Sequence, residues 1–189
     1  MGDPKKARKT YSRPRSPWRA DQLAQELYLL GNFGLRNKRE LWKAETSLST
    51  VRKQARTLLA ATTEVRQREE KKLLASLHRR GLVAENAALD DILNLTVEDV
   101  LARRLQTMVF KRGLAVSPLH ARQLIVHGHV SLRDRRIKTP GYEVRREEEE
   151  SMKLIGMKEQ AKSAVQPPVP VQAAGEQEAG PVAEAAPTE

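Results

Sequence analysis

The residues of this chain best suited to chemistry are its 34 lysines and arginines, which recur in short runs along the sequence. One stretch, "SPLHARQLIVHGHVSLRDRRIKTPGYEV" (residues 117–144), leaves almost no room for a core of its own, yet it carries Arg122, Arg133, Arg135, Arg136 and Lys138. Cations at this density attract polyanions at long range and bind phosphates by releasing counterions. The chemistry predicted for this stretch is therefore recognition of a phosphate backbone.

The positive charge is unevenly distributed. The 189 residues have a formal net charge of +10, but from Glu159 onward five acids face one base, Lys162. That segment carries about −4, which leaves about +14 on residues 1–158. Nucleic acid is the leading partner class and an anionic membrane is the second. No apolar run approaches about 18 residues, and residues 1–19 lack the apolar segment of a signal peptide. We therefore expect a soluble cytoplasmic protein with no membrane partner.

Composition argues against an enzyme or a metal protein. The chain has no cysteine, and its only histidines are His78, His120, His127 and His129. The "HGH" motif at residues 127–129 lacks partners for a metal site, and Gly128 is better explained as a helix stop. The "EEEE" run at residues 147–150 is interpreted as a solvated charge run. No glycine-rich phosphate loop or nucleophile elbow occurs, so we expect no catalytic residue, cofactor, metal or small-molecule substrate.

Residues 1–18 form a basic arm that prolines 4, 14 and 17 keep from becoming helical. Its aromatic residues, Tyr11 and Trp18, are placed to stack on bases or to pack against a docked body. The alternative is a tail that only aids solubility. We interpret the arm as RNA-binding through Lys5, Lys6, Arg8, Lys9, Arg13 and Arg15.

Residues 19–95 have a helical pattern. Leu23, Leu27 and Leu30 predict a first helix that stops at Gly31 or Gly34. The second helix is expected to begin with a capping box formed by Asn37 and Glu40. Its apolar side comprises Leu41, Leu48, Val51, Ala55, Leu58 and Leu59. Its other side presents Arg52, Lys53 and Arg56, either as an RNA-facing stripe or as an ordinary solvated face.

A third helix is predicted near residues 63–80, with Gly81 as its stop and ion pairs along its "REEKK" run. The following "ENAALDDILNL" is expected to form a turn or an irregular helix.

A second unit is predicted at residues 96–160, opened by a helix between Thr96 and Gly113. Helical spacing gives this helix two stripes. The packing stripe comprises Val97, Leu101, Leu105, Met108 and Val109, and the stripe offered to a partner comprises Arg103, Arg104, Thr107 and Lys111.

The next helix has Ser117 as N-cap, Pro118 at its first position and Gly128 as its stop. The runs "HVSL" and "YEV" then alternate like the arms of a hairpin. The predicted fold class is α+β, in which a mostly helical N-terminal part precedes two helices packed on a small antiparallel sheet. Residues 161–189, rich in Pro, Ala and Glu, are expected to form a disordered acidic tail.

Several of these motifs resemble a known family. "DVLARRLQTMVFKRG", "SPLHARQLIVHGHV" and "TPGYEV" resemble the S-four RNA-binding domain. With "GDPKKARKTY", "NKRELWKAE", "RKQARTLL" and "ILNLTVEDVLARRLQT", the resemblance extends over nearly all of residues 2–158 to the small-subunit ribosomal protein S four family. The match is to the archaeal and eukaryotic branch, whose eukaryotic member is called S nine. Arg133 and Asp134 stand at the hairpin turn, where the family often has a glycine-containing pair.

The resemblance implies a structural protein of the small ribosomal subunit that binds rRNA early and nucleates assembly of the subunit body. It also implies contact with ribosomal protein S five, which is linked to decoding accuracy, and a position near the path by which mRNA enters. The RNA-facing residues that it implies are Arg103, Arg104, Lys111, Arg112, Arg122, Gln123, His127, Arg135 and Arg136. Two alternatives remain at this point, a non-ribosomal RNA-binding protein and an RNA-modification enzyme that carries an S-four domain.

Overall fold

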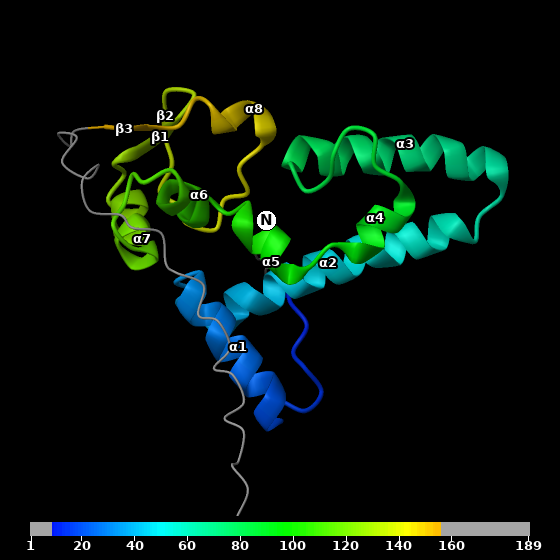
Figure 1. Cartoon of the computed structure of the whole chain (residues 1–189), viewed down its shortest axis with the longest axis horizontal. Coiled ribbons are helices and arrows are strands. Elements are labelled where there is room, and N and C mark those ends of the chain that lie inside the picture. Colours follow the sequence, from blue (N-terminus) through cyan, green and yellow to red (C-terminus); the bar gives the residue numbers. More distant parts are fainter. Residues whose placement is uncertain (1–8, 156–189) are drawn as a thin grey trace, which may run out of the picture.

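The computed structural model describes residues 9–155, which fold into eight helices and one small sheet (Figure 1). The elements are α1 (Ala20–Asn32), α2 (Lys38–Leu59), α3 (Thr63–Arg80), α4 (Leu89–Asn94), α5 (Val97–Ala102), α6 (Leu105–Lys111), α7 (Pro118–Val126), β1 (Val130–Leu132), β2 (Arg135–Arg136), α8 (Arg146–Glu149) and β3 (Lys153–Leu154). The predicted α+β class is confirmed. Lys5, Lys6, Arg8 and the predicted disordered tail lie outside the described residues.

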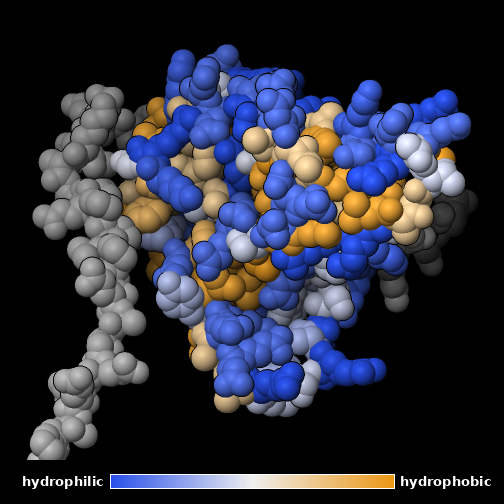
Figure 2. Space-filling view, turned by 45° about the vertical axis from the view of Figure 1, so that its right-hand side comes forward, coloured by the Kyte–Doolittle hydropathy of each residue, from blue (hydrophilic) through white to orange (hydrophobic). Residues whose placement is uncertain are grey.

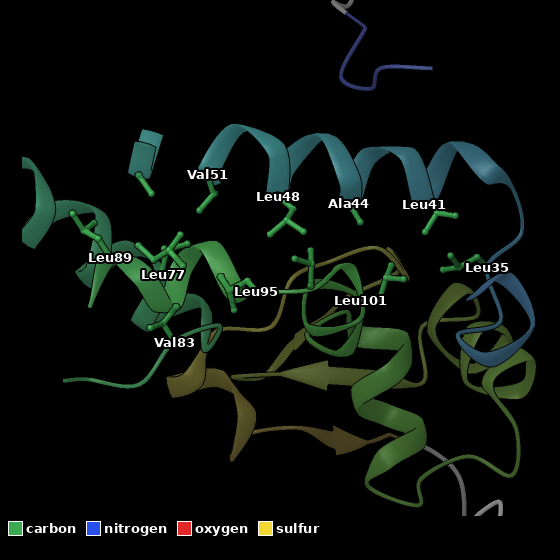
Figure 3. Packing of buried hydrophobic residues seen from close by; sticks show 13 residues of the cluster. Leu35, Leu41, Ala44, Leu48, Val51, Leu77, Val83, Leu89, Leu95 and Leu101 are labelled. Atoms are coloured by element: carbon green, nitrogen blue, oxygen red, sulfur yellow. The ribbon is translucent and has the colours of Figure 1, made fainter. Parts of the chain in front are cut away.

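The first core, which we call the N-terminal core, is built on one side of α2. Leu41, Ala44, Leu48 and Val51 recur at helical spacing and point toward α4, α5 and the end of α3 (Figure 3). Full burial of a leucine such as Leu41 contributes about 1.5–3 kcal/mol. The predicted apolar side of α2 is thus confirmed along most of its length, although Leu59 at its end is exposed.

The second core, the C-terminal core, lies between the helices α6 and α7 and the sheet. Leu105 and Val109 from α6 and Ile125 from α7 are completely buried against Val130 of β1. Ser117 caps α7 by accepting a hydrogen bond from the His120 amide, as predicted. Two helices on a small sheet therefore form this unit, in agreement with the sequence.

The predicted continuous helix from Thr96 to Gly113 is wrong. Thr96 and Asp99 do form a capping box, but α5 ends at Ala102 and Arg104 is extended, with φ −70° and ψ 143°. A segment from elsewhere in the chain replaces the helical hydrogen bonds, because the Leu105 amide donates to the Tyr142 carbonyl at 2.8 Å. The break turns α5 into the N-terminal core and α6 into the C-terminal core.

The antiparallel sheet has the order β2-β1-β3. The predicted second arm, "YEV", is wrong: β2 and β3 pair with β1, whereas Glu143 forms only an isolated bridge with Arg104. Arg133 and Asp134 make the two-residue turn between β1 and β2, with φ values of 46° and 65°. A two-residue turn with positive φ at both positions matches the right-handed twist of the strands, and Asn-Gly is the pair usually found there. Here an ion pair from Arg133 to Glu147 at 2.6 Å adds support.

A comparison of Gly34 with Gly31 tests how the chain turns from α1 into α2. Gly34 has φ +58°, and a Cβ there would lie 2.7 Å from Pro118 Cβ, whereas a Cβ on Gly31 within α1 would meet nothing within 4 Å. We expect Gly34→Ala to lower the free energy of unfolding by about 2 kcal/mol or more. Gly31→Ala should raise it by about 0.5–1 kcal/mol. Urea denaturation followed by circular dichroism measures both; equal effects would contradict the turn geometry.

Candidate nucleic-acid interface

Glu40, in the first turn of α2, binds two arginines of the C-terminal unit. Its Oε2 accepts a hydrogen bond from Arg104 Nη2 at 2.7 Å. Arg122 donates from Nη2 to Oε1 at 2.7 Å and from Nη1 to Oε2 at 3.2 Å. The predicted capping box is therefore wrong, because Asn37 makes no side-chain cap and Glu40 turns toward the arginines. Fork-shaped contacts of this kind are the strongest hydrogen bonds between charged side chains.

Gln106 extends this contact to a third segment. Its side chain is completely buried, and Nε2 donates to the Gly34 carbonyl at 2.8 Å and to the Pro118 carbonyl at 3.0 Å. Its Oε1 accepts from Arg122 at 3.2 Å. We call Glu40, Arg104, Gln106 and Arg122 the Glu40 cluster. It fastens the α1–α2 turn and α2 to α6 and α7.

The cluster stays ionised because its charges compensate one another. Burial would raise the pKa of Glu40, but the hydrogen bond from Arg122 and the positive charge of Arg104 outweigh it and lower that pKa below 4.5. Burial also lowers the pKa of Arg104, an effect that Glu40 opposes. Arg104 is only 8% exposed, and its Nε has no hydrogen-bond partner within the described residues. Its position therefore depends on Glu40.

The predicted partner-facing stripe on residues 103–111 is wrong for three of its four members. Arg104 and Thr107 are buried, and Thr107 donates to the Leu101 carbonyl at 2.8 Å. Arg103 is held inside by hydrogen bonds to the Arg80 and Val144 carbonyls and to Glu149. The break between α5 and α6 rotates these side chains inward, and of this stripe only Lys111 remains exposed.

Most of the other predicted RNA-binding residues lie at the surface. Those within the described part of the chain that keep exposed side chains are Lys9, Arg13, Arg15, Lys53, Arg56, Lys111, Arg112, Gln123, His127, Arg135 and Arg136. Arg122 is partly exposed within the Glu40 cluster, and Arg52 is turned onto the Leu95 carbonyl. Figure 2 shows hydrophilic side chains over most of one face, with a hydrophobic band across its middle.

We give the name hairpin patch to a set of exposed polar and basic residues of the C-terminal unit: Gln123, His127, Arg135, Arg136 and Lys138. Gln123 lies in α7 and His127 is the residue that ends this helix, whereas Arg135 and Arg136 form β2. Lys138 passes over Gly128 at the end of α7, with its Cε 3.4 Å from where a Cβ would stand. No described carboxylate pairs with the three bases of the patch, which leaves them available to an external anion.

The arm lies against α2 at its described end. Tyr11 stacks on Trp42 with ring centroids 6.1 Å apart, and the Ser12 amide donates to Thr46 Oγ1 at 2.9 Å. Of the two roles left open for the arm aromatics, stacking on bases or packing against a body, Tyr11 has the second within this chain. Arg13 and Arg15 follow it with exposed side chains, so the arm adds cations beside α2.

A further basic group was missed by the sequence analysis. Arg79 and Arg80 end α3, and Arg145 and Arg146 begin α8, which packs against α3. Arg146 Nη1 lies 2.9 Å from His78 Nε2, so α8 and the end of α3 are in direct contact. The runs "HRR" and "RRE" were the available signal, but residues so far apart along the chain are united only by the fold.

The acidic run at residues 147–150 is not simply solvated, contrary to the sequence interpretation. It lies in and beside α8, where Glu147 pairs with Arg133, Glu148 accepts from the Tyr142 hydroxyl at 2.9 Å, and Glu149 pairs with Arg103 at 3.0 Å.

Predicted ion pairs along α3 are confirmed for Glu69 and Lys72. Among residues 9–155, no three His, Cys, Asp or Glu side chains gather as a metal site would require. None of the described helices is long and apolar enough to cross a membrane.

Comparison with known proteins agrees with this two-part organisation. The model of the "Ribosomal protein S4/S9 N-terminal domain" matches residues 5–102, and that of the "S4 domain" matches residues 103–150. The two matches meet at the break between α5 and α6.

Curated relatives extend this match to most of the chain. The "Small ribosomal subunit protein uS4" of Ignicoccus hospitalis is 57% identical over 82% of this chain and 92% of its own length. The protein of the same name from Hyperthermus butylicus is 56% identical over 79% of this chain and 85% of its own length. The one from Cenarchaeum symbiosum is 54% identical over 82% of this chain and 76% of its own length.

Replacement of Glu40 tests the cluster through its dependence on pH. Because the pKa of Glu40 is lowered by folding, its contribution is fully present above the unfolded value of 4.5 and is lost as the pH falls through the folded pKa. We expect Glu40→Gln to lower the free energy of unfolding by about 2–4 kcal/mol at neutral pH, since it leaves Arg104 buried without its counter-charge.

The difference between Glu40→Gln and the native protein should shrink below pH 4.5, where the native carboxylate is progressively protonated. Chemical denaturation at a series of pH values measures it. Glu69→Gln is the control, because its pair with Lys72 is exposed and is worth about 0.5 kcal/mol or less. A pH-independent loss would show that Glu40 acts by its shape and not by its charge.

Proposed function

Because the chain belongs to the ribosomal protein S4 family, we propose that it is a structural component of the small ribosomal subunit, acting in the cytoplasm by binding rRNA directly. The observation that carries the proposal is the identity of 54–57% to proteins named for that subunit, over about four fifths of the chain. The exposed bases of the described surface supply the chemistry that such a role needs. No catalytic step is part of this proposal.

Binding would rest on contacts to phosphates and on the shape of the RNA. A-form helices have a deep, narrow major groove that side chains do not read, so arginines and lysines mainly meet phosphates and 2′-hydroxyls. The hairpin patch offers Arg135, Arg136 and Lys138, none of which forms an ion pair with a carboxylate of residues 9–155. Lys53, Arg56 and the arm add cations on the N-terminal unit.

The Glu40 cluster would determine which RNA is bound. It joins the two units, so the bases of α2 and those of the hairpin patch are held at a fixed separation. A rigid body with two basic surfaces selects RNA helices that are already arranged at a matching angle. A junction of several helices meets that requirement, whereas a single duplex meets only one surface.

The finer parts of the proposal follow the family resemblance. They are early docking on such a junction, nucleation of the subunit body, contact with ribosomal protein S five that affects decoding accuracy, and a position beside the path by which mRNA enters. Lys5, Lys6 and Arg8 would extend the RNA contact of the arm. The rigid two-part body supports early docking, because it requires no other protein to align its two basic surfaces.

Sedimentation tests the central proposal against the two alternatives. The native protein should co-migrate with small ribosomal subunits in a sucrose gradient at moderate salt. A free RNA-binding protein or an RNA-modification enzyme would remain mainly at the top of the gradient or associate only transiently. Absence from the subunit fraction in cells that express the protein would contradict the proposal.

Charge reversal in the hairpin patch tests the RNA-binding surface. Arg135→Glu combined with Arg136→Glu should weaken binding to small-subunit rRNA more than tenfold and lower the log-log salt slope by about 2, since two phosphate contacts no longer release counterions. The helical circular dichroism should not change, because both side chains are exposed. Filter binding over a salt series measures the affinity.

The matched control for this variant is Arg68→Glu combined with Lys71→Glu, on the exposed side of α3. It makes the same change in net charge outside the proposed surface. An equal loss of affinity in both double variants would mean that only the total charge matters and would remove the hairpin patch from the proposal.

A further inference from the structure

An apolar groove runs beside α1. It measures about 650 Å³ and is lined by Ala24, Gln25, Tyr28, Leu29, Val97 and Glu98. A second hollow of about 510 Å³ shares Gln25, Leu29 and Val97 with it and continues to Asp21 and Glu45. We call the two together the α1 groove. Residues from α1, α2 and α5 therefore form one continuous hollow surface.

Three large apolar side chains in and just before α1 are exposed in the described part of the chain. Tyr28 is 65% exposed and its neighbour Leu27 is 58% exposed, both on the outer side of α1. Trp18, just before α1, is 86% exposed. Apolar side chains grouped on the surface of a highly charged protein commonly mark a site of protein contact. Their burial against a partner would remove this surface from water.

The side chains that line the groove are mainly acidic, whereas the chain as a whole is basic. Asp21, Glu45 and Glu98 line it, and Arg19 is the one base among its lining residues. The whole chain, by contrast, has a formal net charge of +10. An RNA phosphate would be repelled from these carboxylates, whereas a basic polypeptide segment would be attracted. Charge and apolarity together identify the occupant as a basic segment of protein.

Glu45 is the specific feature that requires a cation. Burial, reinforced by the nearby charge of Glu26, raises the pKa of Glu45. Glu26 is already satisfied by Lys38 at 2.8 Å and by the Trp42 indole at 3.1 Å. No hydrogen bond or ion pair within residues 9–155 reaches the Glu45 carboxylate. An external lysine or arginine would supply the counter-charge and relieve the repulsion from Glu26.

We propose that the α1 groove binds a basic segment of a neighbouring protein in the small ribosomal subunit, with a lysine or arginine on Glu45 and an apolar side chain against Tyr28. The choice of a subunit protein as the partner rests on the proposed function. The chemistry of the segment rests on the groove alone. The chain would thus use different surfaces for different partners, basic surfaces for RNA and an acidic-apolar groove for protein.

Cross-linking from within the groove tests this proposal. Ala24 is exposed and lines the groove, so it is replaced by the photoreactive p-benzoylphenylalanine, and purified small subunits containing the protein are irradiated. Mass spectrometry should identify a peptide of another subunit protein with a lysine or arginine within a few residues of the cross-link. Glu45→Gln should lower the cross-link yield per incorporated chain by about fivefold, the change expected when one partly buried ion pair is lost.

The control for Glu45→Gln is Glu69→Gln on α3, which should leave the yield unchanged. The proposal would be overturned by a cross-link to rRNA, to a second copy, or to residues 1–8 or 156–189 of the same chain. A peptide without a base, no cross-link, or equal yields in the two variants would overturn it as well. Failure of the protein to enter subunits at all would instead overturn the proposed function, and with it the choice of partner.

Discussion

The carboxylate of Glu40 is the contact on which the arrangement of the molecule depends. Each core is apolar and complete within its own unit, but the units meet through charged and polar atoms. Glu40, Arg104, Gln106 and Arg122 form one junction, and Arg103 and α8 form a second one at the end of α3. Without the carboxylate, Arg104 would be a buried cation with no counter-charge, a costly arrangement. Such a joint requires a defined geometry, because hydrogen bonds between charged groups lose strength quickly when they are misaligned.

The distribution of carboxylates determines which bases face outward. Glu26, Glu40, Glu147 and Glu149 each bind a base of the same chain, so these acids serve to hold the fold together. The bases of the hairpin patch have no such partner within the described residues. Conversely, Glu45 has a partly buried carboxylate that no described base reaches. The same balance of charge therefore explains both the RNA surface that we propose and the acidic groove beside α1.

Local signals allowed the sequence to predict much of the fold. The bounds of α3, the helix start at Thr96 and the Ser117–Pro118 start of α7 depend on residues within one or two turns, and all three are present in the structure. The break at Arg103–Arg104 was not predictable in this way, because its cause is the segment at residues 140–144, which supplies the hydrogen bonds that replace the helix.

The same limit applies to the candidate site. Glu40 had a plausible local role as a capping residue, yet its partner Arg122 lies 82 residues further along the chain. Exposed bases such as Arg135 and Arg136 were identified correctly as surface residues from charge and resemblance. Arg103 and Arg104 were assigned to the surface because one continuous helix was assumed where the structure has a break. The direction of a side chain at such a break depends on tertiary contacts, which local spacing does not reveal.

The break between α5 and α6 also bears on how the protein is made. The buried members of the N-terminal core all fall between Leu35 and Leu101, and those of the C-terminal core fall between Leu105 and Met152. Neither core contains a buried side chain from the other side of the break. The first core can therefore fold during translation, before the residues of the second have been synthesised. During that interval Glu40 lies at the surface of a nascent domain, and its carboxylate gains its partners only after Arg104 and Arg122 have been synthesised.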